Sequence, residues 1–550
     1  MLDDERAVPR ALTGVEVALV VIAVIIGALS RSRGFTNGDL WFDDAWAASA
    51  ARTGLGNAWH MFLTAPGYGF VQREWIRLDP TTTWWAQIPA FVFGVAAIPA
   101  TWATARWMKF DRWMAVAAAF FIAVNPTLIL YSTRVKEYPF DLLMALGLVV
   151  VAESVRRRPD ATRWSVLVAV SVGAVLMSAS MLIAVLGVWL VVAICVWPHR
   201  DQRRPFATSV AAVGVGIGAT YVAFFRHVPA VLNFNWRRRG YLLDIRNVHL
   251  AERSIRLMFG GFAHSALMYP VPKVFYRTGR VSQAVSPMLV GMVVLAVVIA
   301  VPVVRSWRVR RVDRALVAAV TLAGAVAAAL VDLVPFGDGR TDEVLYPSFV
   351  MASCAALTAA ARWLSARSIP SFTMSTRRAV GVVLASALVI GSGAMAMSHT
   401  ARYPVLSLRT LAPRLADRLA PGDVVVIDTF NSFGWCYYRL TPCHYVIGGR
   451  PVWPQGFRPT SNDATYYVSP NYSGPYPDMA RALEGHKRVW YIGYTYGTFD
   501  ASSPQLAHLR GPSSVYGAIV RSGWVPATSR GAVVSATNVF AQLLLPSSPH

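Results

Sequence analysis

The sequence predicts a polytopic α-helical membrane protein that carries a smaller α/β domain at its C-terminal end. Composition is the first reason, since 55% of the 550 residues are hydrophobic and only 15% are charged, whereas soluble proteins carry about 25% charged residues. The second reason is a series of apolar segments near the length of about 20 residues that crosses a bilayer. The third is the abundance of tryptophan and tyrosine, with 19 and 20 residues, which are typical of membrane–water interfaces.

Eleven apolar segments are expected to form transmembrane helices. They are 13–30, 84–105, 113–130, 139–155, 164–180, 181–198, 206–225, 287–304, 315–334, 346–364 and 379–397. The stretch 164–198 could be one long helix or two short ones broken near Ser178 to Ser180. Two helices are favoured, because with eleven spans and a cytoplasmic N-terminus every inside connection is short and basic, as the positive-inside rule expects.

The first span is expected to be retained as a helix. No Ala-x-Ala-like cleavage site follows it, and an acidic run from Asp3 to Glu5 precedes it. The topology then places five segments on the outer side of a bacterial plasma membrane. They are 31–83, 131–138, 226–286, 335–345 and the region from 398 onwards.

The first outer segment contains two adjacent carboxylates, Asp43 and Asp44, among Trp41, Phe42 and Trp46. One interpretation is helix capping, because Asp is favoured in the first turn of a helix. The other is a catalytic base in a partly apolar pocket, where lost hydration keeps a carboxylate basic near neutral pH. Asp79 and Glu74, later in the same segment, are candidates for a further carboxylate.

Three cations lie in the two short outer links, Arg134 and Lys136 in YSTRVKEY and Arg340 in GDGRTDEVL. Side chains at such positions often reach toward lipid headgroups. The same positions suit binding of a phosphate at headgroup depth, which arginine and lysine recognise well. Three cations in two links favour a phosphorylated lipid.

The outer loop 226–286 is strongly basic and contains Arg237 and Arg238. Residues 250–262 have the spacing of an amphipathic helix that lies on the membrane surface. Such a loop attracts anionic lipid or an anionic glycan, and non-specific headgroup contact is the alternative. The formal net charge of +23 does not indicate nucleic acid, because most of the arginine lies in short runs between apolar spans.

The C-terminal region, 398–550, is predicted to be a soluble extracytoplasmic α/β domain, long enough to bury its own core. Strands are expected within 422–432, 488–497 and 533–546, and a helix precedes the first of them. Cys436 and Cys443 lie close enough in sequence to form a disulfide if this region is extracytoplasmic. The cysteine spacing predicts no zinc site.

Three motifs together resemble the GT-C glycosyltransferases. They are the Asp43–Asp44 pair, the stretch from Ser132 to Asp141 and an outer arginine shortly before the Tyr-Pro at position 346. The nearest likeness is to the branch with protein O-mannosyltransferases and the aminoarabinose transferase of lipid A, over residues 15–365. That superfamily usually has Asp-Glu for the first motif and Ser-x-Glu-x-Arg-x-Tyr for the second. This chain has Ser132, Arg134, Lys136 and Tyr138.

The resemblance implies transfer of a sugar from a polyprenyl-phosphate donor to a glycan, lipid or protein of the envelope, with inversion at the anomeric carbon. It implies Asp43 as the general base, Asp44 as an orienting group, and Arg340, Lys136 and Arg134 as ligands of the donor phosphate. Other expected contacts to donor or acceptor come from Tyr138, Asp79, Trp46, Arg237 and Arg238. No metal is expected to be required, although a divalent cation at Asp43 and Asp44 stays open.

Two functions of other classes are weighed beside this one. A lipid or glycan transporter or flippase needs ionisable or broken-helix features at mid-membrane, and the centres of the predicted spans are almost free of charge. A non-catalytic envelope assembly protein does not need catalytic-type residues in three separate outer segments. The sequence leaves the sugar and the acceptor open.

Overall fold

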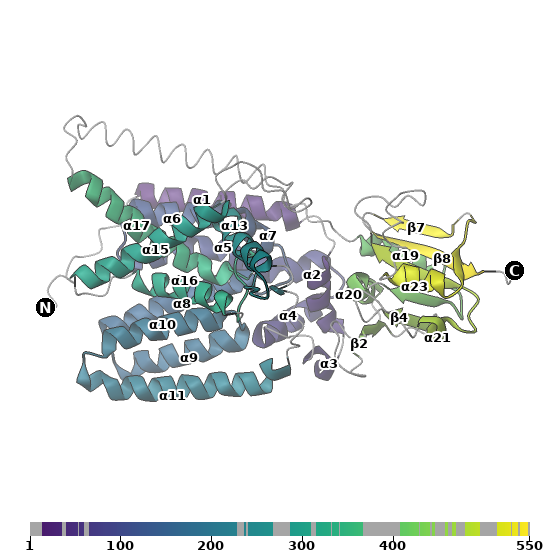
Figure 1. Ribbon diagram of the computed structural model, residues 1–550, viewed down its shortest axis with the longest axis horizontal. Helices are drawn as coiled ribbons and strands as arrows, with labels where there is room; N and C mark the ends of the chain where they lie inside the picture. Colours follow the sequence, from purple (N-terminus) through teal and green to yellow (C-terminus); the bar gives the residue numbers. More distant parts are fainter. Residues whose placement is uncertain are drawn as a thin grey trace. The chain divides into compact units, whose positions relative to one another are not determined.

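The computed structural model describes most of the chain, with gaps. The described residues are 14–35, 40–52, 54–59, 65–227, 236–237, 240–267, 287–309, 315–331, 333–339, 341–366, 407–427, 429–439, 443–445, 457–459, 465–468, 479–494, 514–529, 531–536 and 539–547. The chain divides into two compact units (Figure 1). We call them the helical unit (Met1–Phe35, Pro89–Thr133, Glu137–Ala401) and the sheet unit (Thr36–Ile88, Arg134–Lys136, Arg402–His550).

The helical unit is a bundle of apolar helices. They are α1 (Gly14–Phe35), α5 (Thr83–Trp107, in this unit from Pro89), α6 (Arg112–Val124), α7 (Pro126–Tyr131), α8 (Tyr138–Arg157), α9 (Ala161–Met177), α10 (Met181–Val196), α11 (Arg200–Ala223), α13 (Val248–Leu267), α15 (Pro287–Val309), α16 (Leu316–Leu330) and α17 (Tyr346–Ala366). Each predicted span up to residue 364 lies on one of these helices or on the α6–α7 pair. The eleventh, 379–397, and the predicted domain boundary at 397 lie outside the described residues.

Among the described residues, five helices are long and apolar enough to cross a membrane, and other apolar helices are shorter. The stretch 164–198 is two helices, as predicted, because Ser178 is extended and ends α9. The predicted span 113–130 is interrupted at Asn125. Its side chain caps α7 by accepting hydrogen bonds from Thr127 N and Leu128 N, and Pro126 has no N–H with which to continue α6.

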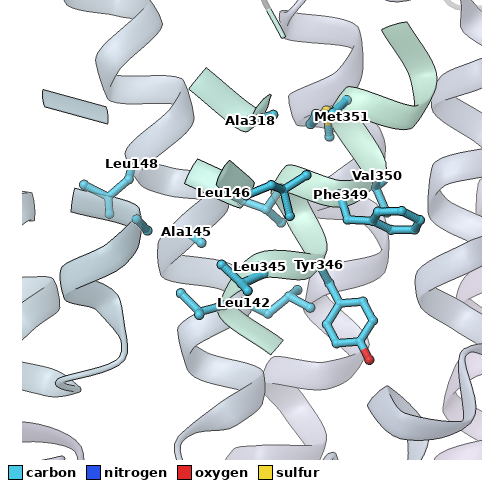
Figure 2. Close-up of a cluster of buried hydrophobic side chains, with 14 of the residues drawn as sticks. Leu142, Ala145, Leu146, Leu148, Ala318, Leu345, Tyr346, Phe349, Val350 and Met351 are labelled. Carbon is cyan, nitrogen blue, oxygen red and sulfur yellow. The ribbon is translucent and has the colours of Figure 1, made fainter. Parts of the chain in front are cut away.

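The core of the helical unit is a continuous apolar layer between α8, α16 and α17. Figure 2 shows Leu146 of α8 beside Phe349 of α17, with Leu142 one turn earlier on α8. All these side chains are buried, and burial of each stabilises the bundle by about 1.5–3 kcal/mol.

Helix α13 corrects the expectation of a helix on the membrane surface. Its apolar residues Met258, Phe262 and Ala266 are buried in the core of the helical unit, and the Phe262 ring stacks on Phe336 at 5.3 Å. The apolar face is therefore covered by protein. The sequence period fixed the amphipathic character of the helix but not what covers its apolar face.

The sheet unit is built on a mixed sheet in the order β4-β1-β5-β8-β6, with β7 paired to β8. Its strands are β1 (Val424–Ile427), β4 (Thr465–Val468), β5 (Val489–Tyr494), β6 (Trp524–Pro526), β7 (Val533–Ala536) and β8 (Val539–Pro546). A separate pair joins β2 (Cys443–Tyr445) and β3 (Phe457–Pro459). Strand β1 runs parallel to β4 and β5, whereas β8 runs antiparallel to β5.

Strand β1 is buried on both faces, as its continuous apolar run predicts. Val425 and Ile427 pack in one apolar cluster, and Val424 and Val426 pack in another. The helices of this part are α19 (Leu408–Ala416), α20 (Thr429–Arg439), α21 (Met479–Leu483) and α23 (Val515–Arg521). The strands within 422–432 and 488–497 and the preceding helix are confirmed. The predicted single strand 533–546 is instead the antiparallel pair β7 and β8.

The first outer segment folds together with the C-terminal region in the sheet unit. Its helices are α2 (Phe42–Ser49), α3 (Leu55–Trp59) and α4 (Pro66–Leu78). Helix α2 packs on α20: Trp46 stacks on Phe433 at 5.1 Å, and Ser49 Oγ donates a hydrogen bond to the Phe433 carbonyl at 2.9 Å. The Leu40 N–H donates to the Tyr438 hydroxyl at 2.8 Å. These contacts fix α2, and with it the carboxylate pair, on a buried core.

Candidate active site

The carboxylate pair lies in the first turn of α2, where negative charge interacts favourably with the helix dipole. Trp41 holds the N-cap position and makes no side-chain cap hydrogen bond. The two carboxylates have different surroundings. Asp44 is 1% exposed, whereas Asp43 is half-buried. Burial thus separates two residues that the sequence presents as equivalents.

Asp44 is held by the link 134–136. Its carboxylate accepts a hydrogen bond from Arg134 Nη1 at 2.9 Å and one from Val135 N at 3.1 Å. Burial raises the pKa of the Asp44 carboxyl above its usual range, and the charges of Arg134 and Lys136 offset part of that rise. Since a buried ion pair depends on both partners, Asp44 is the point at which this link attaches to α2.

The link itself is part of the sheet unit, although the residues on either side of it belong to the helical unit. Val135 is fully buried in the apolar cluster that contains Leu40, Ala45 and Trp46. Lys136 is half-buried beside Asp44, close enough for its charge to act on that carboxyl. The structure therefore brings the predicted residues Asp44, Arg134 and Lys136 together around one helix turn.

Two of the predicted substrate contacts have structural roles instead. Trp46 is 5% exposed, and its stacking on Phe433 gives it a packing role in place of the predicted substrate contact. Asp79 accepts hydrogen bonds from Thr81 N at 3.0 Å, Thr81 Oγ at 2.7 Å and Thr82 N at 3.2 Å. These hydrogen bonds lower the pKa of Asp79 to about 2, so this carboxylate closes a turn after α4.

The remaining predicted site residues fall elsewhere. In the helical unit, Tyr138 begins α8 and its ring meets Tyr131 edge-on at 5.2 Å. Arg237 is half-buried, and its charge acts on Asp244. Arg340, Arg238 and the side chains of Cys436 and Cys443 lie outside the described residues.

A buried polar cluster in the helical unit was missed at the level of sequence. Arg31 is fully buried and donates hydrogen bonds to the Ile122 and Ala123 carbonyls at 2.9 Å and to Ser132 Oγ at 3.0 Å. It interacts electrostatically with Glu343, which is 1% exposed. Neither carboxylate oxygen of Glu343 has a hydrogen-bond partner in the described part of the chain.

Asp141 belongs to the same cluster. It is 1% exposed and accepts hydrogen bonds from Ser178 Oγ at 2.8 Å and Ser180 Oγ at 2.5 Å, so the break between α9 and α10 serves this carboxylate. Its charge also acts on Glu343. Ionisable groups buried among apolar helices are costly and mark functional sites by default. The signal in the sequence was a charge at the end of an apolar segment, at Arg31, Asp141 and Glu343.

The turn before Glu343 is fixed by Asp342. Its carboxylate accepts hydrogen bonds from Gly337 N at 2.9 Å and Gly339 N at 3.0 Å. Burial raises the pKa of Asp342 to about 7. Gly337 has a φ of +87°, and a Cβ there would lie 2.1 Å from the Met258 carbonyl oxygen, so only glycine fits this turn.

The described residues contain no group of three or more His, Cys, Asp or Glu that could hold a metal ion. Metal dependence therefore stays a prediction from sequence.

No protein-family model and no curated protein sequence matches the chain. Among solved structures, the chain is similar to ArnT from Cupriavidus metallidurans in the apo state, with 15% identity over 96% of this chain and 98% of that chain and a TM-score of 0.49. A second ArnT structure, bound to undecaprenyl phosphate, gives 15% identity over 97% and 98% and a TM-score of 0.48. Arabinofuranosyltransferase AftD from Mycobacteria gives 13% identity over 98% of this chain and 42% of that chain, with a TM-score of 0.45.

With similarity this low, the function has to be inferred from the residues of the chain itself.

Proposed function

We propose that this protein is a membrane glycosyltransferase that moves a sugar from a polyprenyl-phosphate donor to an envelope acceptor on the extracytoplasmic side. The observation that carries the proposal is the unequal carboxylate pair on α2. Asp44 is buried and anchored by Arg134 and Val135, while its neighbour Asp43 is only half-buried. Asp44 fixes the helix turn, and Asp43 is the carboxylate of the pair whose partial exposure lets an acceptor approach it.

Asp43 is the general base in this proposal. The acceptor hydroxyl loses its proton to the Asp43 carboxylate, and its oxygen bonds to the anomeric carbon of the donor sugar. The bond from that carbon to the phosphate oxygen breaks, and the electron pair leaves on the lipid phosphate. A single displacement of this kind inverts the anomeric carbon. General base catalysis contributes about 10²–10⁴-fold to the rate.

Asp44 positions the base. Because its two hydrogen bonds hold the first turn of α2 against the link 134–136, they also fix the direction of Asp43, one residue earlier in the same turn. A carboxylate that is 1% exposed cannot itself reach an acceptor in this conformation. This division of roles supports Asp43, not Asp44, as the base.

The leaving phosphate needs cations. Lys136, half-buried beside Asp44, and Arg340 are proposed to stabilise the charge that develops on it. One well-placed donor of this type is worth about 2.7–4 kcal/mol of transition-state stabilisation. Arg134 pairs with Asp44, so we propose that its main role is to hold that carboxylate. Its predicted contact with the donor phosphate is then a secondary role.

The test is transfer by the purified protein in lipid vesicles, with a panel of undecaprenyl-phosphate sugars and an extract of envelope glycans and lipids as acceptors. Undecaprenyl phosphate is the natural probe to start from, because a structurally similar ArnT was solved with it. We expect Asp43→Asn to lower kcat at least about a hundredfold with little change in KM for the donor.

Asp79→Asn is the matched control, since Asp79 lies in the same outer segment and its hydrogen bonds are satisfied within its own turn. Transfer by Asp43→Asn at the wild-type rate would remove Asp43 as the base. Absence of transfer by the wild type from every sugar in the panel, with labelled lipid appearing on the opposite leaflet instead, would favour a flippase.

A further inference from the structure

Three tryptophans of the helical unit carry an arginine on their ring face. Arg157 lies over Trp107 at 4.7 Å, Arg112 over Trp113 at 4.9 Å and Arg203 over Trp197 at 5.2 Å. The rings are nonetheless exposed, at 45%, 44% and 62% of their surface. Exposed tryptophan is typical of the headgroup layer of a membrane, and arginine both stacks on aromatic faces and binds phosphate.

These pairs lie at one end of the bundle, the end that the sequence predicts to be cytoplasmic. Arg157 donates a hydrogen bond to the Trp107 carbonyl at 2.7 Å, which ties the end of α8 to the end of α5. Arg163 donates to Ser154 Oγ at 3.0 Å, which ties the start of α9 to the same place. Near the end of α10, Cys195 lies close enough to Arg156 and Glu153 for their charges to act on its thiol, so Trp197 and Arg203, which follow α10, lie at this end too.

The turn between α5 and α6 has an unusual residue at its centre. Lys109 has a φ of +57° and is the one non-glycine residue with positive φ in the described part of the chain. Its N–H donates to the Arg106 carbonyl at 2.9 Å, and the Phe110 N–H donates to the Ala105 carbonyl at 3.0 Å. This is the hydrogen-bond pattern of a Schellman motif, in which the left-handed position is usually glycine.

A lysine at a glycine position points to a role for its side chain, because the backbone alone would favour glycine. Attraction to the dipole at the end of α5 is the simplest role. The surroundings suggest another. Basic residues outnumber acidic ones over 106–112 and 156–163, so this end of the bundle carries net positive charge. Asp111, the acid within the turn, caps α6 by accepting a hydrogen bond from Trp113 N.

We propose that the α5–α6 turn, with the adjoining end of α8, is a binding site for the phosphate of an anionic phospholipid. Lys109 and Arg112 are its phosphate ligands, and Trp107 and Trp113 lie at headgroup depth on either side. The occupant is a lipid because the cations alternate with exposed tryptophan rings, a pattern that matches the border between headgroups and acyl chains. The site does not depend on the proposed transferase activity.

Native mass spectrometry of the delipidated protein, titrated with phosphatidylglycerol or phosphatidylcholine, tests the site. We expect the wild type to bind phosphatidylglycerol more tightly. Lys109→Gly and Arg112→Gln should each weaken that binding about fivefold, the effect of one cation near an anionic surface. Arg33→Gln is the charge-matched control, because Arg33 is exposed at the opposite end of α1. It should leave phosphatidylglycerol binding unchanged.

Lys109→Gly separates a ligand from a structural residue. Glycine suits the left-handed turn, so the Tm of this variant in detergent should be equal to or above that of the wild type while lipid binding falls. Equal phosphatidylglycerol binding by the wild type and by the double variant Lys109→Gly, Arg112→Gln would overturn the proposal, as would an equal loss of binding in Arg33→Gln. Displacement of bound phosphatidylglycerol by inorganic phosphate at an equal concentration would show a site for free anions and would also overturn the proposal.

Discussion

Breaking the buried Asp44–Arg134 ion pair should lower the free energy of unfolding of the sheet unit far more than the loss of an exposed ion pair would. In Asp44→Asn, the amide oxygen still accepts the Val135 N–H, but Arg134, whose side chain is 11% exposed, loses its anion. A buried charge left without its partner costs about 3–5 kcal/mol of the free energy of unfolding. We expect that loss for Asp44→Asn near neutral pH.

Arg134→Gln should behave differently with pH. It leaves the Asp44 carboxylate buried without its cation, but Asp44 can take up a proton. Burial already raises the pKa of this carboxyl in the wild type, and loss of Arg134 raises it further. A raised folded-state pKa stabilises the protein below the unfolded pKa, and this stability is lost as pH rises through the folded value. The penalty of Arg134→Gln is therefore expected to be small in mild acid and large at pH 8.

The double variant Asp44→Asn, Arg134→Gln carries no buried charge at either position. It should cost less than the sum of the single variants, with a coupling energy of about 2–3 kcal/mol. Guanidinium unfolding in mild detergent, followed by tryptophan fluorescence, is the assay, because Trp435 and Trp490 are fully buried in this unit. Single-variant losses that add to within about 0.5 kcal/mol, or an Arg134→Gln penalty that does not change with pH, would refute the reasoning.

Two further predictions concern the helical unit. Glu343→Gln should lower the Tm in detergent, because fully buried Arg31 loses the anion that acts on it. Below that Tm, sugar transfer should fall at least about tenfold, and undiminished transfer would show that Glu343 has no part in function. Asp342, with a pKa raised to about 7 by burial, stabilises the fold when protonated, so the wild type should lose about 1.4 kcal/mol of stability from pH 6 to pH 8. Asp342→Asn should abolish that step in a comparison of thermal unfolding at the two pH values, and a step of the same size in the variant would assign it to another group.

The sequence by itself determined the local elements. The apolar segments from 13 to 364 are helical, the stretch 164–198 divides at Ser178, and the runs at 424–427 and 489–494 are strands. These features follow from hydrophobic period and from breaking residues, which act over a few neighbouring positions. The period of 250–262 likewise predicted a helix with one apolar face.

Only the tertiary structure decided which surfaces cover these elements. It buried the apolar face of α13 in protein, packed Trp46 on Phe433 and paired Asp44 with Arg134, ninety positions further along the chain. Tertiary packing also gave Asp43 and Asp44 different exposure to solvent, because the exposure of a side chain depends on the segment that packs against it. That segment is chosen by contacts between distant parts of the chain, which no local pattern of residue types encodes.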